Sequence, residues 1–244
     1  MIKTPVSQTP LKLFAPYLPQ ANKQGIGVLA ANHLLVNIDP YPDMEPGDLI
    51  ELFWGDCYVA SKVLSASDIG YTSVLHIAES FLQTGKVKTY YRVTKIGSES
   101  VRSPSLKLWV KLETPGGHLV IADGEENQGL SPVRFPEWVA DKGLSRKHLA
   151  TGIDIFIDSY PHMEAYDEIT LRWGDVRMDF PALTELQVGK AVRLHVPGSL
   201  IREAGDDEHQ EVTYCVIDRV GNNSLWAPPR SIRVSIADAI GSDH

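Results

Sequence analysis

Cysteine is scarce in this sequence. The 244 residues include only Cys57 and Cys215, and neither lies in a CxxC pair or near a histidine at a metal-ligand spacing. Proteins that depend on a disulfide framework carry many more cysteines at regular spacings. The sequence therefore excludes such a framework, and we expect two semi-buried free thiols.

Long hydrophobic runs are also missing. No apolar segment approaches the roughly 20 residues that a membrane-spanning helix needs, and residues 1–19 contain no continuous apolar stretch of the signal-peptide type. Hydrophobic residues still make up 43% of the chain, which is enough for one large domain or two ordinary ones. We expect a globular protein without membrane insertion and without a visible export signal. Cell-surface, secreted and cytoplasmic locations all stay open.

Basic residues are outnumbered by acidic ones, 23 to 31, and the formal net charge is −8. The excess lies in the second half, because residues 1–116 carry 11 basic and 10 acidic side chains whereas residues 117–244 carry 12 and 21. Nucleic-acid binding requires a basic face that releases counterions from the phosphate backbone. We therefore expect no nucleic-acid partner.

Motifs of common catalytic and cofactor sites are absent as well. The sequence has no glycine-rich phosphate loop, no HExxH and no GxSxG. No serine, cysteine or acid recurs near His76 or His195 at a spacing that suggests a triad, although a triad is assembled in space rather than in sequence. We expect no catalytic residue, no cofactor and no bound metal.

What the sequence does contain is a long internal repeat. Residues 39–56, DPYPDMEPGDLIELFWGD, align without a gap with residues 158–175, DSYPHMEAYDEITLRWGD, and 11 of the 18 positions are identical. The offset of 119 continues as far as His76 and His195. After a five-residue insertion around EAGDDEHQ the offset becomes 124, which aligns Tyr90 with Tyr214. Such a repeat indicates a duplicated structural unit.

The repeat divides the chain into domains. TPLKL at 9–13 resembles SPVRF at 131–135, and these segments place the start of each copy. Between the copies lies TPGGHLVIADGEENQGL, a glycine-bearing and acidic stretch that is typical of a linker. We expect a first domain at 1–116, a linker at 117–130 and a second domain at 131–244.

Each copy has the pattern of β-strands. In DLIELFWGD the apolar residues Ile50, Leu52 and Trp54 recur at every second position, and a Gly-Asp turn follows, as in the second copy. No segment shows a convincing helical period. The remaining apolar segments, PLKLF included, bring each copy to about seven short strands. The sequence predicts an all-β protein of two tandem immunoglobulin- or fibronectin-type antiparallel β-sandwiches.

Most residues that the copies share have structural explanations. Trp54 and Trp173 continue the buried faces of their strands, so we expect core anchors rather than ligand platforms. We place His76 and His195 on the solvent face. The shared acids could gather oxygens for calcium, but their spacing matches no calcium loop and aspartate is a common turn residue. These acids are Asp39, Glu45, Asp48 and Asp56, with Asp158, Glu164, Asp167 and Asp175.

The order of these motifs resembles a known family. YPxM, GDxIxLxWG, TYYRVT and a final PGG are similar to the tandem immunoglobulin-like repeats of long bacterial surface or adhesin-type proteins, notably those of pseudomonads. The second copy departs from the pattern, with Tyr166 at the position of Gly47 and no PGG after Ile236. The resemblance implies a non-enzymatic role in a surface or secreted protein and transfers no catalytic residue. In the first copy it covers Tyr41, Pro42, Met44, Gly47, Asp48, Trp54, Gly55, Tyr90, Tyr91, Arg92, Val93, Pro115, Gly116 and Gly117.

We therefore expect a structural or adhesive binding protein whose ligand is a protein or a glycan. Candidate binding residues are sought where the copies differ, at Arg172, Arg177 and Trp226. Trp226 lies in the loop GNNSLWAPP, where the first copy has Arg102, and an aromatic at a loop tip is a reasonable ligand contact. Burial of Trp226 against its own sandwich is an equal alternative.

The insertion at 203–211 supplies a second candidate site. Asp206, Asp207 and His209 could attract a cation there, although a solvated hairpin loop is the preferred interpretation. Two other functions stay open: a small secreted effector or toxin-type protein exported without an N-terminal signal, and a hydrolase with its site between the domains. The oligomeric state is not predicted.

Overall fold

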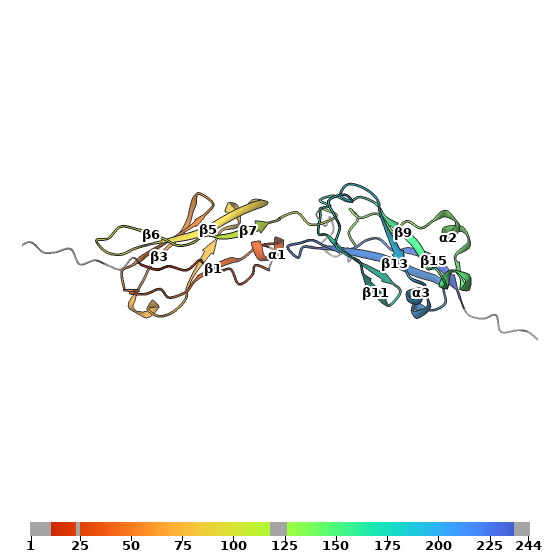
Figure 1. The fold of residues 1–244 in the computed structure, drawn as a ribbon, viewed down its shortest axis with the longest axis horizontal. Helices are drawn as coiled ribbons and strands as arrows, with labels where there is room; N and C mark the ends of the chain where they lie inside the picture. The colour runs from red at the N-terminus through yellow and green to blue at the C-terminus, as the bar shows by residue number, and fades with distance from the viewer. Residues whose placement is uncertain (1–10, 23–24, 118–125, 237–244) are drawn as a thin grey trace, which may run out of the picture. The chain divides into compact units, whose positions relative to one another are not determined.

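The computed structural model describes residues 11–22, 25–117 and 126–236. The chain forms two compact units, Met1–Leu112 and Glu113–His244, which we call unit 1 and unit 2. Strands dominate both units, and the helices are short (Figure 1). In the part of the chain that the structure describes, no helix is long and apolar enough to cross a bilayer.

Unit 1 is a sandwich of two sheets. Its strands are β1 (Leu34–Ile38), β2 (Leu49–Trp54), β3 (Cys57–Val63), β4 (Ser73–Ile77), β5 (Gly85–Thr94), β6 (Val101–Arg102) and β7 (Leu106–Val110), and its helices are α1 (Val28–Ala31), η1 (Ala66–Asp68) and η2 (Glu79–Phe81). The smaller sheet pairs β1 with β4, and Tyr17 bridges to Asn37 at its edge. The larger sheet has the order β3-β2-β5-β6, with β7 also paired to β5. Ile26 adds a parallel bridge to Val110 of β7.

The alternation of buried and outward-facing residues along the strands accounts for the core of unit 1. Successive side chains of a strand point to opposite faces, so a period of two gives each sheet one apolar face. The apolar faces of the two sheets meet in a single hydrophobic cluster. Its members include Leu34, Val36 and Ile38 from β1, Ile50, Leu52 and Trp54 from β2, and Leu75 and Ile77 from β4.

Unit 2 repeats this arrangement. Its strands are β8 (Leu144–Ser145), β9 (Ile153–Ile157), β10 (Glu168–Trp173), β11 (Val176–Asp179), β12 (Val192–Val196), β13 (Asp207–Ile217), β14 (Asn223–Trp226) and β15 (Arg230–Ser235), and its helices are α2 (Glu137–Lys142), η3 (Arg146–Leu149) and α3 (Gly198–Ala204). β9 pairs with β12, and the larger sheet has the order β11-β10-β13-β15-β8, with β14 on β13. β8 runs parallel to β15. The chain is therefore all-β, with two tandem immunoglobulin- or fibronectin-type β-sandwiches, as the sequence predicts.

The aromatic anchors and the strand histidines lie where the sequence places them. Trp54 and Trp173 are 5% and 0% exposed, and both belong to the cores. His76 and His195 are exposed on the outer faces of β4 and β12, between buried neighbours. Of the thiols, Cys57 is exposed and Cys215 is buried, so neither is semi-buried.

Strand pairing corrects the sequence alignment after the insertion. Ile50 pairs with Val93, and its counterpart Ile169 pairs with Val216, so β5 and β13 match at an offset of 123 rather than 124. A slip of one residue moves a side chain to the other face of a sheet. The predicted equivalence of Tyr90 with Tyr214 is therefore wrong.

The corrected register assigns new partners. Tyr91 is the counterpart of Tyr214, and both rings are buried in the cores, at 1% and 0% exposure. Tyr90 lies on the outer face instead. Beyond the following turn the offset is 124. Arg102 pairs with Arg92, and Trp226 pairs with Cys215, which is the counterpart of Arg92 at the offset of 123. The predicted equivalence of Arg102 with Trp226 is confirmed.

Some connections differ from the sequence prediction. The stretch 203–211 is not a hairpin loop, because it ends α3 and begins β13. Gly205, with φ +83°, terminates the helix in the left-handed region that favours glycine. Residues 11–14 of the predicted PLKLF strand form no strand.

The segment between the copies packs into unit 2 where it is described. Asn127 and Leu130 are 1% and 2% exposed, and Pro115 and Gly116 are buried as well. Residues 118–125 of the predicted linker lie outside the described residues. The boundaries at 116 and 131 stay predictions.

Candidate binding surface

A buried tyrosine–aspartate pair fixes the β1–β2 connection of unit 1. The phenol of Tyr41 donates a 2.9 Å hydrogen bond to Oδ2 of Asp48, which also accepts the backbone N–H of Glu45 at 3.1 Å. Asp48 is 2% exposed, and its carbonyl accepts the N–H of Leu64 at 2.9 Å. The pair therefore ties the connection to the start of β2 and to the end of β3.

Unit 2 contains the same pair. Tyr160 donates to Oδ2 of Asp167 at 2.9 Å, and the N–H of Glu164 reaches the same oxygen at 3.0 Å. Burial, together with the neighbouring carboxylate, raises the pKa of Tyr160 well above its ordinary value, so the phenol stays protonated and donates. Asp48 and Asp167 thus organise turns, as predicted for the shared acids. The described residues contain no cluster of three or more His, Cys, Asp or Glu side chains suited to a metal ion.

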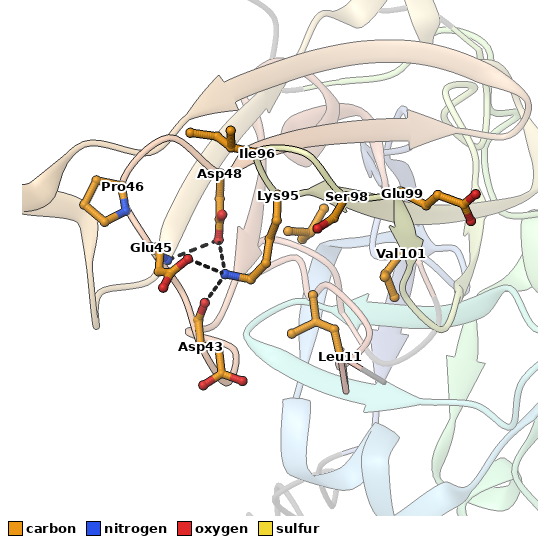
Figure 2. Close-up of a pocket in the computed structure, with 11 residues that line it drawn as sticks. Leu11, Asp43, Glu45, Pro46, Asp48, Lys95, Ile96, Ser98, Glu99 and Val101 are labelled. Carbon is orange, nitrogen blue, oxygen red and sulfur yellow. Dashed lines mark hydrogen bonds and ion pairs between the residues drawn. The ribbon is translucent and has the colours of Figure 1, made fainter. Parts of the chain in front are cut away.

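A hollow of about 660 Å³ opens beside this corner in unit 1 (Figure 2). The β1–β2 and β5–β6 connections form its walls, and Leu11 closes one side. Nζ of Lys95 lies 3.2 Å from Oε2 of Glu45 and 3.4 Å from Oδ2 of Asp48, and it donates to the carbonyl oxygen of Asp43. Figure 2 shows this ammonium in contact with all three oxygens. Lys95 therefore offsets one of the two carboxylate charges at the corner.

The predicted binding residues Arg172, Arg177 and Trp226 come together on unit 2. The guanidinium carbon of Arg172 lies 4.9 Å from the centroid of the Trp226 ring, and that of Arg177 lies 5.4 Å from it. Arg172 and Arg177 are also direct neighbours across β10 and β11. These distances are those of cation–π contacts. A guanidinium that stacks by its plane keeps its N–H groups available at the edge.

The cluster lies on the outer face of the larger sheet of unit 2. Leu171 and Trp173 point into the core, so Arg172 between them points outward. Trp226 pairs with Cys215 on β13, which is 7% exposed. Burial raises the pKa of the Cys215 thiol, so this group is a neutral neighbour of the cluster rather than a nucleophile.

Unit 1 carries a different cluster of the same kind on the matching face. The rings of Phe53 and Tyr90 are stacked, with centroids 5.0 Å apart and planes 5° from parallel. Arg92 lies 4.7 Å from the centroid of Phe53, and Arg102 lies 3.6 Å from that of Tyr90. Tyr58 packs edge-on against Phe53 at 6.1 Å. Arginine and aromatic residues have exchanged places between the copies, since Phe53, Tyr58 and Arg102 correspond to Arg172, Arg177 and Trp226.

The remaining predicted binding residues lie elsewhere. Asp207 and His209 begin β13, whereas Cys215, beside Trp226, lies near its end. Eight residues of strand separate Asp207 from Cys215, which is about 26 Å of chain. Oδ1 of Asp206 accepts the N–H of Ile236, and Oδ1 of Asp207 accepts the N–H of His209 at 2.8 Å. The six predicted residues therefore do not form one site.

Sequence reasoning missed the cluster on unit 1. Tyr90 was hidden by the alignment error, which placed it opposite a buried tyrosine. A signal was nevertheless present, because Phe53 and Tyr58 flank the Gly-Asp turn at outward positions of a hairpin. Outward aromatics on both strands of a hairpin indicate a ring cluster.

Comparison with solved structures finds matches of low sequence identity and low TM-score. No protein-family model and no curated protein matches the sequence. A structure from a 1.5-MDa bacterial ice-binding adhesin is 15% identical with a TM-score of 0.40, covering 97% of this chain and 71% of that one. Fibronectin(III)-like modules of Clostridium thermocellum CbhA are 10% identical with a TM-score of 0.42, covering 94% and 98%. A tetra-tandem repeat from the extending region of a large adhesion protein is 13% identical with a TM-score of 0.32, covering 91% and 49%.

Proposed function

We propose that the protein is a non-enzymatic adhesive binding module of two immunoglobulin-like units, surface-associated or secreted, that contacts a protein or a glycan. The two units keep the same core and the same tyrosine–aspartate corner, whereas their outer faces carry different side chains. A scaffold that is kept while its faces change suits the presentation of contacts to partners. This pattern gives no support to a catalytic site, because both copies would have to retain its reactive residues.

The cluster of Arg172, Arg177 and Trp226 carries the proposal. Tryptophan and arginine are the residue types that contribute most to binding energy at interfaces. In the part of the chain that the structure describes, neither guanidinium of this cluster has a hydrogen-bond or ion-pair partner. Arginine edges suit carboxylate or sulfate oxygens, and the indole offers an apolar plane on which a sugar ring or a side chain can stack. The ligand we propose therefore bears acidic groups.

An array of carboxylated, sulfated and neutral glycans, together with a panel of immobilised acidic and neutral proteins, tests this function. We expect the chain to bind acidic members, and we expect Trp226→Ala to weaken that binding by at least about tenfold, as for an interface anchor. Trp138→Ala is the matched control, because Trp138 is 42% exposed on α2 and its ring contacts that of His148 instead. Unchanged binding by Trp226→Ala contradicts the proposal.

A further inference from the structure

The two units differ in how completely the same end of the sandwich is covered. Ile96 in the β5–β6 turn of unit 1 is 84% exposed, whereas Val220, which likewise precedes a left-handed glycine in the β13–β14 turn, is 5% exposed. Leu11 is only partly buried in the hollow of unit 1, whereas Val133, its sequence counterpart, is 2% exposed. Equivalent apolar positions are thus buried in unit 2 and open in unit 1.

Residues 113–117 lie against this end in unit 2. The N–H of Gly116 donates to the carbonyl oxygen of Pro161 at 2.9 Å, and the amide of Asn222 donates to the carbonyl oxygen of Glu113 at 3.5 Å. Asn222 belongs to the same turn as Val220. The segment therefore bridges the β9–β10 connection and the β13–β14 turn.

Residues 126–130 complete the cover. The side-chain amide of Asn127 donates to the carbonyl oxygens of Pro115 and Ser224, at 3.2 and 2.9 Å. Gly116 has φ +80°, and a Cβ there would meet Asn127 and Leu130 at 3.0 Å or less. The fit is tight enough to require glycine at this position.

Unit 1 offers the matching acceptor surface without such a cover among the described residues. Pro42 holds the position of Pro161, and no described residue donates a hydrogen bond to its carbonyl oxygen. The hollow of Figure 2 lies at the same connections and is lined by Leu11 and Ile96. Its remaining wall carries the carboxylates of Asp43 and Glu99, which favour an occupant with free backbone N–H groups.

We propose that this hollow is an acceptor site for the segment that leaves the last strand of another immunoglobulin-like unit, a Thr-Pro-Gly-Gly stretch of the kind that follows β7. Its glycine N–H would bond to the carbonyl oxygen of Pro42, and the segment would lie against the turn that carries Ile96, as residues 113–117 lie against the turn of Val220. In unit 2 it is Asn127 and Leu130 that exclude a side chain at Gly116, so a segment that docks in the same conformation needs glycine there. This inference concerns how such units join and is independent of the ligand of the Trp226 cluster.

A graft tests the proposal in the full chain. Residues 1–10 are replaced by a copy of residues 113–132, which sets its Pro132 directly before Leu11. The probe is Ile96→Cys in a Cys57→Ser background, labelled with a thiol reagent. We expect the graft to slow labelling by at least about tenfold, because covered sites react only after local opening. A second graft, with Gly116→Val in the copied segment, restores the fast rate.

The control position is Leu186→Cys, because Leu186 is 81% exposed on unit 2 and should label at one rate in every variant. Equal labelling of Ile96→Cys with and without the graft overturns the proposal. So does equal slowing by both grafts, which would mean an unspecific tether. A free peptide of residues 112–130, added to the ungrafted chain, gives an independent measurement. We expect it to slow labelling of Ile96→Cys alone, and no slowing at its solubility limit contradicts the site.

Discussion

The phenol of Tyr160 lies 2.9 Å from Oδ2 of the fully buried Asp167, and the same distance separates Tyr41 from Asp48. Each pair closes the connection that leads into the second strand of the larger sheet. Neighbours of the pair have changed between the copies, since Tyr166 stands where unit 1 has Gly47. Both copies therefore keep a buried hydrogen bond, and the loss of such a bond destabilises the folded state.

Replacing Tyr160 by Phe should destabilise unit 2 by about 1–3 kcal/mol, because the buried carboxylate loses a hydrogen bond that water cannot replace. Urea unfolding followed by tryptophan fluorescence measures the change. Tyr166→Phe is the control, since Tyr166 also lies in unit 2 and is 54% exposed. Equal unfolding free energies for the two variants would refute the structural role of the pair.

Trp173→Ala should cost about 3–5 kcal/mol, since it empties a fully buried site against Phe135 and the cavity cannot collapse completely. Trp173 is 0% exposed, and its ring meets that of Phe135 edge-on at 5.9 Å. Calorimetry of this variant beside Trp138→Ala separates core loss from loss of an exposed ring. A cost below about 1 kcal/mol for Trp173→Ala would place this side chain outside the core.

Trp226→Ala should expose the Cys215 thiol. Cys215 is the direct cross-strand neighbour of Trp226 and is 7% exposed. In a Cys57→Ser background, we expect thiol labelling to accelerate by about tenfold or more, because reactivity follows access as well as thiolate fraction. Leu225→Ala, one residue before Trp226, serves as the control. An unchanged labelling rate in Trp226→Ala means that the ring does not cover this face.

Acidification should weaken unit 2 through His148. Nδ1 of His148 accepts the backbone N–H of Ser145 at 3.0 Å, so the contact requires an unprotonated nitrogen. Burial, followed by the charge of Lys147, lowers the pKa of His148 below its ordinary 6.5. A group with a lowered pKa in the folded state stabilises above pH 6.5, and this contribution is lost as the pH falls toward the folded-state value.

The measurement is the unfolding free energy of unit 2 between pH 7.5 and pH 5, compared with that of His148→Asn. Asparagine keeps an acceptor near Ser145 but does not titrate, so we expect a shallower decline in this range. Parallel curves for the two proteins would remove His148 from the pH response.

The fold could be predicted because its signals are local. Strand alternation, the Gly-Asp turns and the paired tryptophans act over a few residues, and the repeat supplied each of them twice. The short helices gave no signal, because α3 spans seven residues and shows too few turns for a period. Its boundaries depend on Pro197 and Gly205 rather than on an apolar stripe.

The candidate site could be predicted only in part. Arg172, Arg177 and Trp226 were found as positions of difference, and the pairing of β10, β11 and β14 with their neighbours brought them together. Register is set by hydrogen bonds between distant segments, so sequence identity misplaced Tyr90 by one residue. β13 is longer than its apolar pattern indicates, and this length separates Asp207 from Trp226.

The central claim is that the two copies share one scaffold and carry exchangeable outer faces. Its most direct test is the unfolding free energy of a variant with Arg172→Phe, Arg177→Tyr and Trp226→Arg, which gives unit 2 the residues of unit 1 at these positions. We predict a folded protein within about 1.5 kcal/mol of the parent, because substitutions outside the core each change stability little. A loss of more than about 3 kcal/mol, or failure to fold, would show that this face is part of the scaffold and would contradict the account.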